Sequence, residues 1–139
     1  MSTHSYIGIE NTDGSVESIY CHSDGYLSHN GRVLLTSYAD ERKVRELLAL
    51  GDLSFLAEEI GEFHDYRSHW DNPKAKKWCL SFKRDRGERD VEGKHYTDLV
   101  SWLDGWGCYA YLFREGKWYW TSARVKDLVP LTLADTEED

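Results

Sequence analysis

Two stretches in which apolar and polar residues alternate, one at each end of the chain, constrain the fold most. Near the start, Ile7 and Ile9 fall on one side of an extended backbone, because successive side chains of a strand point to opposite faces. A turn follows at residues 11–14, and a second strand is predicted from Val16 to His22. We therefore predict an N-terminal β-hairpin.

The same pattern returns near the other end of the chain. Strands are predicted from Cys108 to Arg114 and from Lys117 to Ser122, joined by a two-residue turn. We expect the tryptophans of the second strand to build the core. Three tyrosines would then line the opposite face as a partner-binding surface. These are Tyr109, Tyr111 and Tyr119.

Two helices and a further strand are predicted between the hairpins. The first helix begins at Asn30 or Gly31 and ends at Tyr38, and the second runs from Glu41 to Leu50. Asp40 supplies its N-cap, and Gly51 ends it. Residues 52–56 would add one more turn.

The next strand is predicted from Trp78 to Arg84. Its alternation places three large side chains on one face, and we expect them to share a core with the tryptophans of the last hairpin. The members of this predicted core are Trp78, Leu80, Phe82, Trp118 and Trp120. A short helix capped by Thr97 follows, with Leu99, Trp102 and Leu103 on one face.

The predicted element order is β-β-α-α-β-α-β-β. We expect a single α+β domain over residues 1–133, with a mainly antiparallel mixed sheet of about five strands and the helices packed on one face. Residues 134–139 form an acidic tail that we expect to be frayed.

Charge and composition narrow the classes of partner. The chain of 139 residues carries a formal net charge of −8, which disfavours direct binding to nucleic acid. The same charge suits docking on a basic protein surface. A second copy of the chain is an alternative partner, which would give a homodimer.

The polar N-terminus and the absence of a long apolar run predict neither a signal peptide nor a membrane span. Three widely spaced cysteines, Cys21, Cys79 and Cys108, favour reduced thiols in a protein of the host-cell cytoplasm. The sequence shows no metal or cofactor signature.

The densest polar cluster follows the second strand. It contains His22, Asp24, Tyr26 and His29, at a strand end where binding residues often lie. The alternative is an ordinary turn around Asp24 and Gly25, with His22 pointing outward. A Cys21–His22 catalytic pair is disfavoured, because adjacent strand side chains point to opposite faces.

Arg84 and Arg86 lie in a basic run that could bind a phosphate or a carboxylate, or form a turn of alternating charges. A helical crossover normally joins parallel strands, so we expect the strands that end at His22 and at Arg84 to be parallel. The two loops would then form one anion-binding edge. His64 and His69 match no zinc spacing and are interpreted as solvated loop residues.

Several runs support a family resemblance. They are Tyr-Ile-Gly-Ile-Glu-Asn at 6–11, Asp-Gly-Ser-Val at 13–16, Ile-Tyr-Cys-His-Ser-Asp-Gly-Tyr at 19–26, Arg-Asp-Arg-Gly-Glu at 84–88, and the hairpin around 111–118. This set resembles a family of small uncharacterised accessory proteins of bacteriophages and other mobile elements. The resemblance implies an origin rather than an activity, although small phage accessory proteins often counter host immunity.

Three hypotheses of function follow. The first is a non-enzymatic, anti-CRISPR-like inhibitor that binds a host defence protein stoichiometrically. The second is a protein that sequesters a small phosphorylated signal between the two loops. The third is a small hydrolase.

Overall fold

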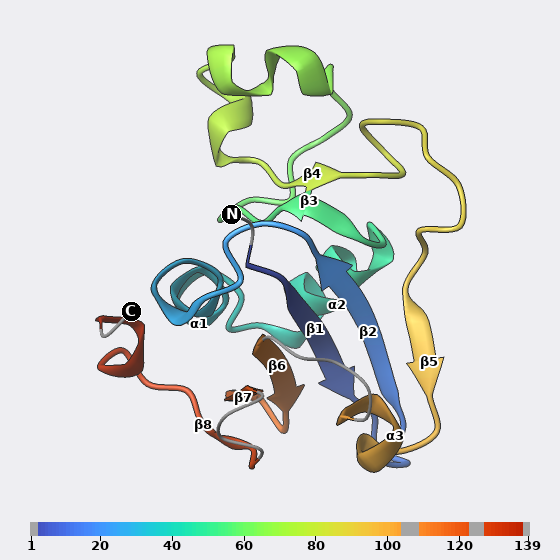
Figure 1. Cartoon of the computed structure of the whole chain (residues 1–139), viewed down its shortest axis with the longest axis vertical. Coiled ribbons are helices and arrows are strands. Elements are labelled where there is room, and N and C mark those ends of the chain that lie inside the picture. Colours follow the sequence, from blue (N-terminus) through green and yellow to red (C-terminus); the bar gives the residue numbers. More distant parts are fainter. Residues whose placement is uncertain (1–2, 104–108, 123–126, 138–139) are drawn as a thin grey trace.

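The fold is a mixed α+β sheet with helices on both of its faces (Figure 1). The computed structural model describes residues 3–103, 109–122 and 127–137. Within these ranges the strands are β1 (Ser5–Glu10), β2 (Val16–Cys21), β3 (Leu53–Phe55), β4 (Leu80–Ser81), β5 (Lys94–Tyr96), β6 (Tyr109–Arg114), β7 (Lys117–Ser122) and β8 (Val129–Pro130). Their order is β4-β3-β2-β1-β6-β7-β8, with β5 paired to β2.

The helical elements are short. The α-helices are α1 (Arg32–Ser37), α2 (Glu41–Ala49) and α3 (Leu99–Leu103). A π-helical turn, η1 (Leu27–Gly31), leads into α1, and the 3₁₀ turns are η2 (Tyr66–Asp71), η3 (Ala75–Lys77) and η4 (Asp135–Glu137). Within the described residues, none of these helices is long and apolar enough to cross a membrane.

Both predicted hairpins are confirmed. β1 and β2 pair antiparallel, as do β6 and β7. The hairpins are joined by parallel pairing of β1 with β6, in which Ile7 lies opposite Tyr111. β2 and β3 are also parallel, while the other pairings among the described strands are antiparallel. The sheet is therefore mixed and mainly antiparallel, with more than the five strands expected.

One face of the sheet carries the larger core, beneath α1 and α2. Ile7 and Ile9 of β1 pack there with Leu34 of α1 and with Val44 and Leu47 of α2. The helix α2 begins as the sequence predicts, because the Asp40 carboxylate accepts a hydrogen bond from the backbone of the first turn.

The prediction of which side chains of the last hairpin point into the core is partly wrong. Trp118 is 4% exposed and lies in this core, as expected. However, Tyr111 and Tyr109 share its face, because residues directly opposite in an antiparallel pair point the same way and Tyr111 pairs with Trp120. Tyr111 is fully buried.

The opposite face is covered by α3, so the expectation that the helices pack on one face is wrong. Trp102 is 2% exposed and packs with Ala110 and Leu112. Its indole N–H donates to the Ser18 hydroxyl at 2.8 Å. A side chain at Gly8 would meet the Trp102 ring at 3.2 Å, so the glycine makes room for the indole.

The strand predicted from Trp78 to Arg84 is reduced to β4. After it, the chain turns back on itself, because the Asp85 carboxylate accepts a hydrogen bond from the backbone N–H of Ser81 at 2.8 Å. Cys79 joins the main core, whereas Trp78 and Phe82 are only half-buried. The predicted grouping of Trp78, Leu80 and Phe82 with Trp118 is therefore wrong.

Two other segments differ from expectation. Residues 53–55, expected as a further turn, form β3 beside β2. Residues 135–137 form η4, in which Thr136 is 1% exposed and which lies against η1. The chain is thus ordered into the region where a frayed tail was expected.

A pair of alanine substitutions tests this assignment of the core. Phe113→Ala should lower the free energy of unfolding by about 3–5 kcal/mol, because Phe113 is 2% exposed in the main core. Phe82→Ala should cost less than half as much, since that ring is half-buried. Chemical unfolding followed by tryptophan fluorescence measures both values. An equal loss from the two variants would contradict the assignment.

Candidate functional site

The candidate site lies on residues 61–89, here called the edge lobe, beyond β3 at the β4 edge of the sheet (Figure 1). The lobe consists mostly of loops and 3₁₀ turns. The polar composition of its first half is typical of an irregular loop. The structure gives it a buried polar base and an exposed aromatic surface.

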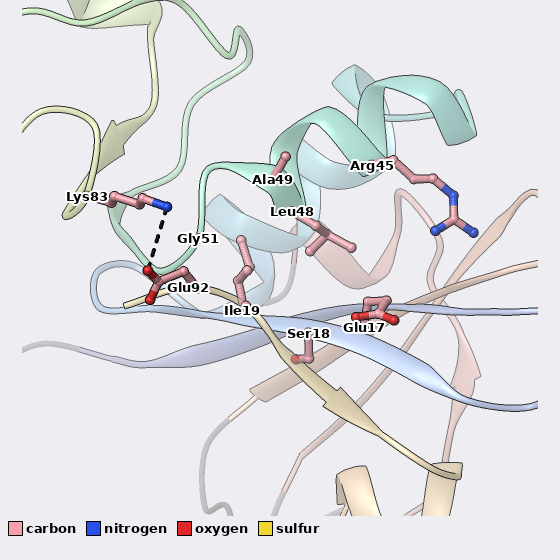
Figure 2. Close-up of a pocket in the computed structure, with 10 residues that line it drawn as sticks. Glu17, Ser18, Ile19, Arg45, Leu48, Ala49, Gly51, Lys83 and Glu92 are labelled. Atoms are coloured by element: carbon pink, nitrogen blue, oxygen red, sulfur yellow. Dashed lines mark ion pairs between the residues drawn. The ribbon is translucent and has the colours of Figure 1, made fainter. Parts of the chain in front are cut away.

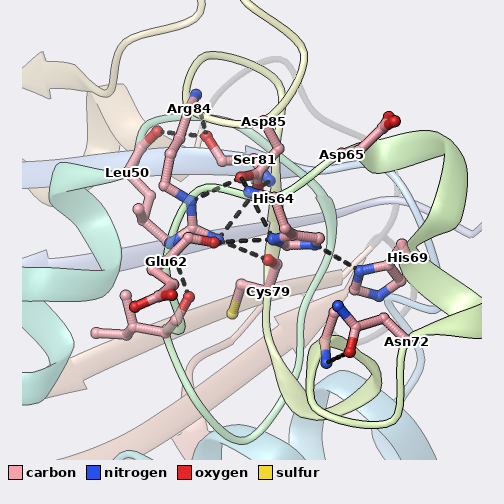
Figure 3. Close-up of polar contacts among 12 residues, drawn as sticks. Leu50, Glu62, His64, Asp65, His69, Asn72, Cys79, Ser81, Arg84 and Asp85 are labelled. Carbon is pink, nitrogen blue, oxygen red and sulfur yellow. Dashed lines mark hydrogen bonds and ion pairs between the residues drawn. The ribbon is translucent and has the colours of Figure 1, made fainter.

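The base of the lobe is an ion pair between neighbouring residues (Figure 3). The Arg84 guanidinium contacts both oxygens of Asp85, at 2.9 and 3.0 Å. It also donates to the backbone carbonyls of Ile60 at 2.8 Å and Cys79 at 2.9 Å. Asp85 is 4% exposed, and a buried carboxylate is costly unless its charge is compensated. Arg84 and backbone N–H groups provide this compensation.

Two histidines extend this network into the lobe (Figure 3). The backbone N–H of His64 donates to Asp85 at 3.3 Å. The ring Nδ1 of His64 lies 2.8 Å from the carbonyl oxygen of Glu62, and its Nε2 lies 2.7 Å from Nδ1 of His69. A carbonyl can only accept, so Nδ1 of His64 carries a proton. In neutral His64, Nε2 then accepts from His69.

His69 ends the network with a buried, unpartnered nitrogen. The residue is fully buried, and its Nε2 has no hydrogen-bond partner within the described structure. Burial lowers the pKa of His69, and the neighbouring His64 lowers it further, against an opposing effect of Asp85. The interpretation of His64 and His69 as solvated loop residues is therefore wrong. No sequence spacing predicts that these two histidines are buried, because their contacts join separate turns of the lobe.

Three aromatic side chains project from the lobe into solvent. Phe63 is 69% exposed, Tyr66 40% and Trp70 56%. Trp70 packs edge-on against His69 at 4.6 Å between ring centroids and against Phe55 at 4.8 Å. These three residues are here called the aromatic surface; Trp70 contacts the buried network directly through His69. Sequence reasoning missed them, although aromatic residues within a polar loop were the available signal.

The lobe also reverses the charge of the protein. Residues 61–89 contain eight basic and five acidic residues, a net charge of +3 in a chain of −8. Arg86 and Arg67 lie over the Tyr66 ring, at 5.1 and 5.6 Å from its centroid. Arg86 also pairs with Glu88 at 3.0 Å, and Arg67 pairs with Asp65 at 3.2 Å. The Tyr66 ring is therefore flanked by two ion pairs.

The predicted loop after β2 is tied to the core through its backbone. The Tyr111 hydroxyl donates to the carbonyl of Gly25 at 2.7 Å, and a side chain at Gly25 would lie 2.5 Å from the His4 carbonyl. Asp24 has a φ of 53° and accepts from the Tyr26 hydroxyl at 3.1 Å. These contacts are those of a structural turn.

The other predicted residues are dispersed. His22 is exposed, with its Nδ1 2.9 Å from the Tyr20 hydroxyl. His29 lies 5.1 Å from the Phe55 ring, with its Nε2 3.0 Å from the Leu56 carbonyl oxygen. Tyr119 points away from the main core, and Arg114 lies over its ring at 5.5 Å.

The expected joint edge of His22 and Arg84 does not form as predicted. β3 is parallel to β2, but β4 is antiparallel to β3, so the strands before His22 and Arg84 run in opposite directions. The parallel orientation was therefore wrong. The Arg84 side chain points into the base of the lobe instead.

A cleft of about 300 Å³ lies between β2, α2 and residues 83–93 (Figure 2). It contains two cations, but both are already paired. Lys83 lies 3.6 Å from Glu92, and Arg45 lies 3.0 Å from Glu41. This cleft therefore has little charge left for an anionic ligand.

The described thiols are unsuited to nucleophilic chemistry. Cys21 and Cys79 are buried and free, while Cys108 lies outside the described residues. Burial raises the pKa of Cys21 to about 12 and also raises the pKa of Cys79. Neither is a thiolate at neutral pH. Within the described part of the chain, no three His, Cys, Asp or Glu residues gather as metal ligands.

Comparison of the chain with protein-family models, with curated proteins and with solved structures finds no match.

The buried imidazole of His69 makes a prediction about pH. The pKa of His69 is lowered in the folded state, so the unfolded chain binds the proton more readily. The resulting stability is present above the ordinary pKa of about 6.5 and is lost as the pH falls below it. His69→Gln should therefore lose less stability than wild type between about pH 7.5 and pH 5.5, by at most about 1.4 kcal/mol, because this window extends one pH unit below the ordinary pKa.

Urea unfolding at several pH values measures this difference. Ser68→Ala, a change at a neighbouring residue that does not titrate, serves as the control and should keep the wild-type pH dependence. If His69→Gln and wild type lost equal stability on acidification, His69 would not be the buried titrating group.

Proposed function

We propose that this chain is a non-enzymatic accessory protein of a phage or another mobile element, which inhibits a host defence protein, in an anti-CRISPR-like way, by stoichiometric binding. The aromatic surface of the edge lobe would make the contact. The exposure of Phe63, Tyr66 and Trp70 on one short segment is the observation that carries the proposal. The resemblance to phage accessory proteins adds the expected setting.

Exposed aromatic residues favour a protein partner for an energetic reason. In a typical interface, a few residues, often Trp, Tyr or Arg, contribute most of the binding free energy. Each exposed ring buries a large apolar area when a partner covers it. Trp70 is already oriented by His69 and Phe55, so less side-chain entropy is lost on binding.

The charge of the lobe indicates what the partner offers. With its net charge of +3, the lobe fits a partner surface that carries carboxylates around an apolar centre. The rest of the chain is strongly acidic and repels such a surface. Binding would therefore be oriented, with the lobe toward the partner.

The alternatives receive less support. A cysteine hydrolase needs a thiolate, and the raised pKa values of Cys21 and Cys79 oppose one. A phosphate site built on Arg84 would have to break the bonds of that guanidinium to Asp85 and two carbonyls. The exposed aromatic surface needs no such rearrangement.

Substitution of the aromatic surface tests the proposal. Phe63→Ser with Trp70→Ser should weaken capture of a host protein by at least about tenfold, because buried aromatic anchors contribute about 2 kcal/mol or more. The captured protein would be identified by mass spectrometry, and its affinity and stoichiometry measured by calorimetry. One equivalent of wild type should abolish its activity.

Val100→Ser with Leu133→Ser provides the matched control, because these apolar side chains are 78% and 54% exposed elsewhere on the chain. This variant should bind like wild type. Phe63→Ser alone guards against a folding defect, since Phe63 is the most exposed ring of the surface. Full binding by the aromatic variants, or equal loss in the control, would refute the proposed surface.

A further inference from the structure

A second concave site lies between α1, β3 and η3. It is a groove of about 270 Å³, close to the lower end of the range of about 300–1,000 Å³ for small-molecule sites. Its lining combines cations with an aromatic side chain. The residues that matter here are His29, Arg32, Phe55, Glu58, Lys76 and Lys77.

Unlike several other arginines of the protein, the cations of this groove have no acidic counterion among the described residues. Arg42, Arg45 and Arg114 each lie within 4.0 Å of an acidic side chain. Arg32, Lys76 and Lys77 form no ion pair with any described residue. Glu58 is the one acid of the lining, so the groove carries a net charge of +2. An anion would supply the missing counterions.

The lysines are presented by an ordered turn. The side-chain oxygen of Asn72 accepts from the backbone N–H groups of Lys74 at 3.0 Å and Ala75 at 3.4 Å. Ala75 is fully buried and anchors η3 to the body of the protein. The backbone of Lys76 and Lys77 is thus fixed beside the groove, while both side chains remain exposed.

The aromatic part of the lining is also preformed. The ring of Phe55 is half-buried and contacts His29, 5.1 Å away, and Trp70, 4.8 Å away. The Nε2 atom of His29 lies 3.0 Å from the backbone carbonyl oxygen of Leu56. A carbonyl only accepts, so Nε2 of His29 carries the proton and the ring orientation is fixed.

We propose that this groove binds a nucleoside phosphate, with the phosphate against Arg32, Lys76 and Lys77 and the base against Phe55. Guanidinium and ammonium groups are the usual side-chain donors to phosphate, and aromatic rings stack on bases whatever their sequence. Glu58 offers an acceptor for the sugar hydroxyls. The groove adjoins the proposed protein-binding surface through the contact of Phe55 with Trp70.

Calorimetric titration of the purified full chain with adenosine monophosphate tests the proposal. Lys76→Ala with Lys77→Ala should weaken binding by at least about tenfold, a change of about 1.4 kcal/mol in binding free energy. Lys94→Ala with Lys117→Ala removes the same charge from exposed residues outside the groove and should leave affinity unchanged. Circular dichroism confirms that each variant is folded.

Two further measurements separate the phosphate from the base. Phe55→Leu should weaken binding of adenosine monophosphate but not that of inorganic pyrophosphate, which has no base. Phe63→Ser, a variant of the aromatic surface, should leave nucleotide binding intact, so the two proposals fail separately. Absence of binding at millimolar nucleotide, or equal binding by the folded groove and control lysine variants, would overturn the inference.

Discussion

The parallel pairing of β1 with β6 is the contact on which the rest of the structure depends. Each hairpin forms from residues close in sequence, but a single hairpin buries too little apolar surface to be stable. Pairing Ile7 with Tyr111 joins the two hairpins into one sheet with two covered faces. The helices α1 and α2 then have a complete surface to pack on, and so does α3 on the other side.

A second constraint acts at the β4 edge, where the Arg84–Asp85 ion pair ends the sheet. An exposed edge strand invites pairing with other chains, and a short edge strand is one way of preventing this. Here the chain turns after Ser81, because Asp85 accepts from its backbone N–H, and the edge lobe lies beyond it. The exposed rings of the lobe therefore lie beyond a buried ion pair whose two partners are hydrogen-bonded to the backbone.

The sequence predicted what local interactions determine. The hairpins, the Asp40 cap of α2 and the apolar face of α3 depend on neighbouring residues, and the structure confirms them. The short strands β3 and β5 could not be predicted, because their pairing partner β2 is far away in sequence. The buried state of His64 and His69 likewise depends on Asp85, which no periodicity connects to them.

The prediction that the loops after His22 and Arg84 form one edge was wrong because of a single strand, β3, that the sequence does not reveal. The rule that helices connect parallel strands holds in this fold, but the strand it governs is β3, which is parallel to β2, and not the strand before Arg84. β4 then returns antiparallel to β3 through the edge lobe. This reversal turns Arg84 into a structural residue. It leaves Lys76 and Lys77, between the two strands, free to face the groove beside α1, so the positive charge available to a ligand comes from the connection and not from the strand end.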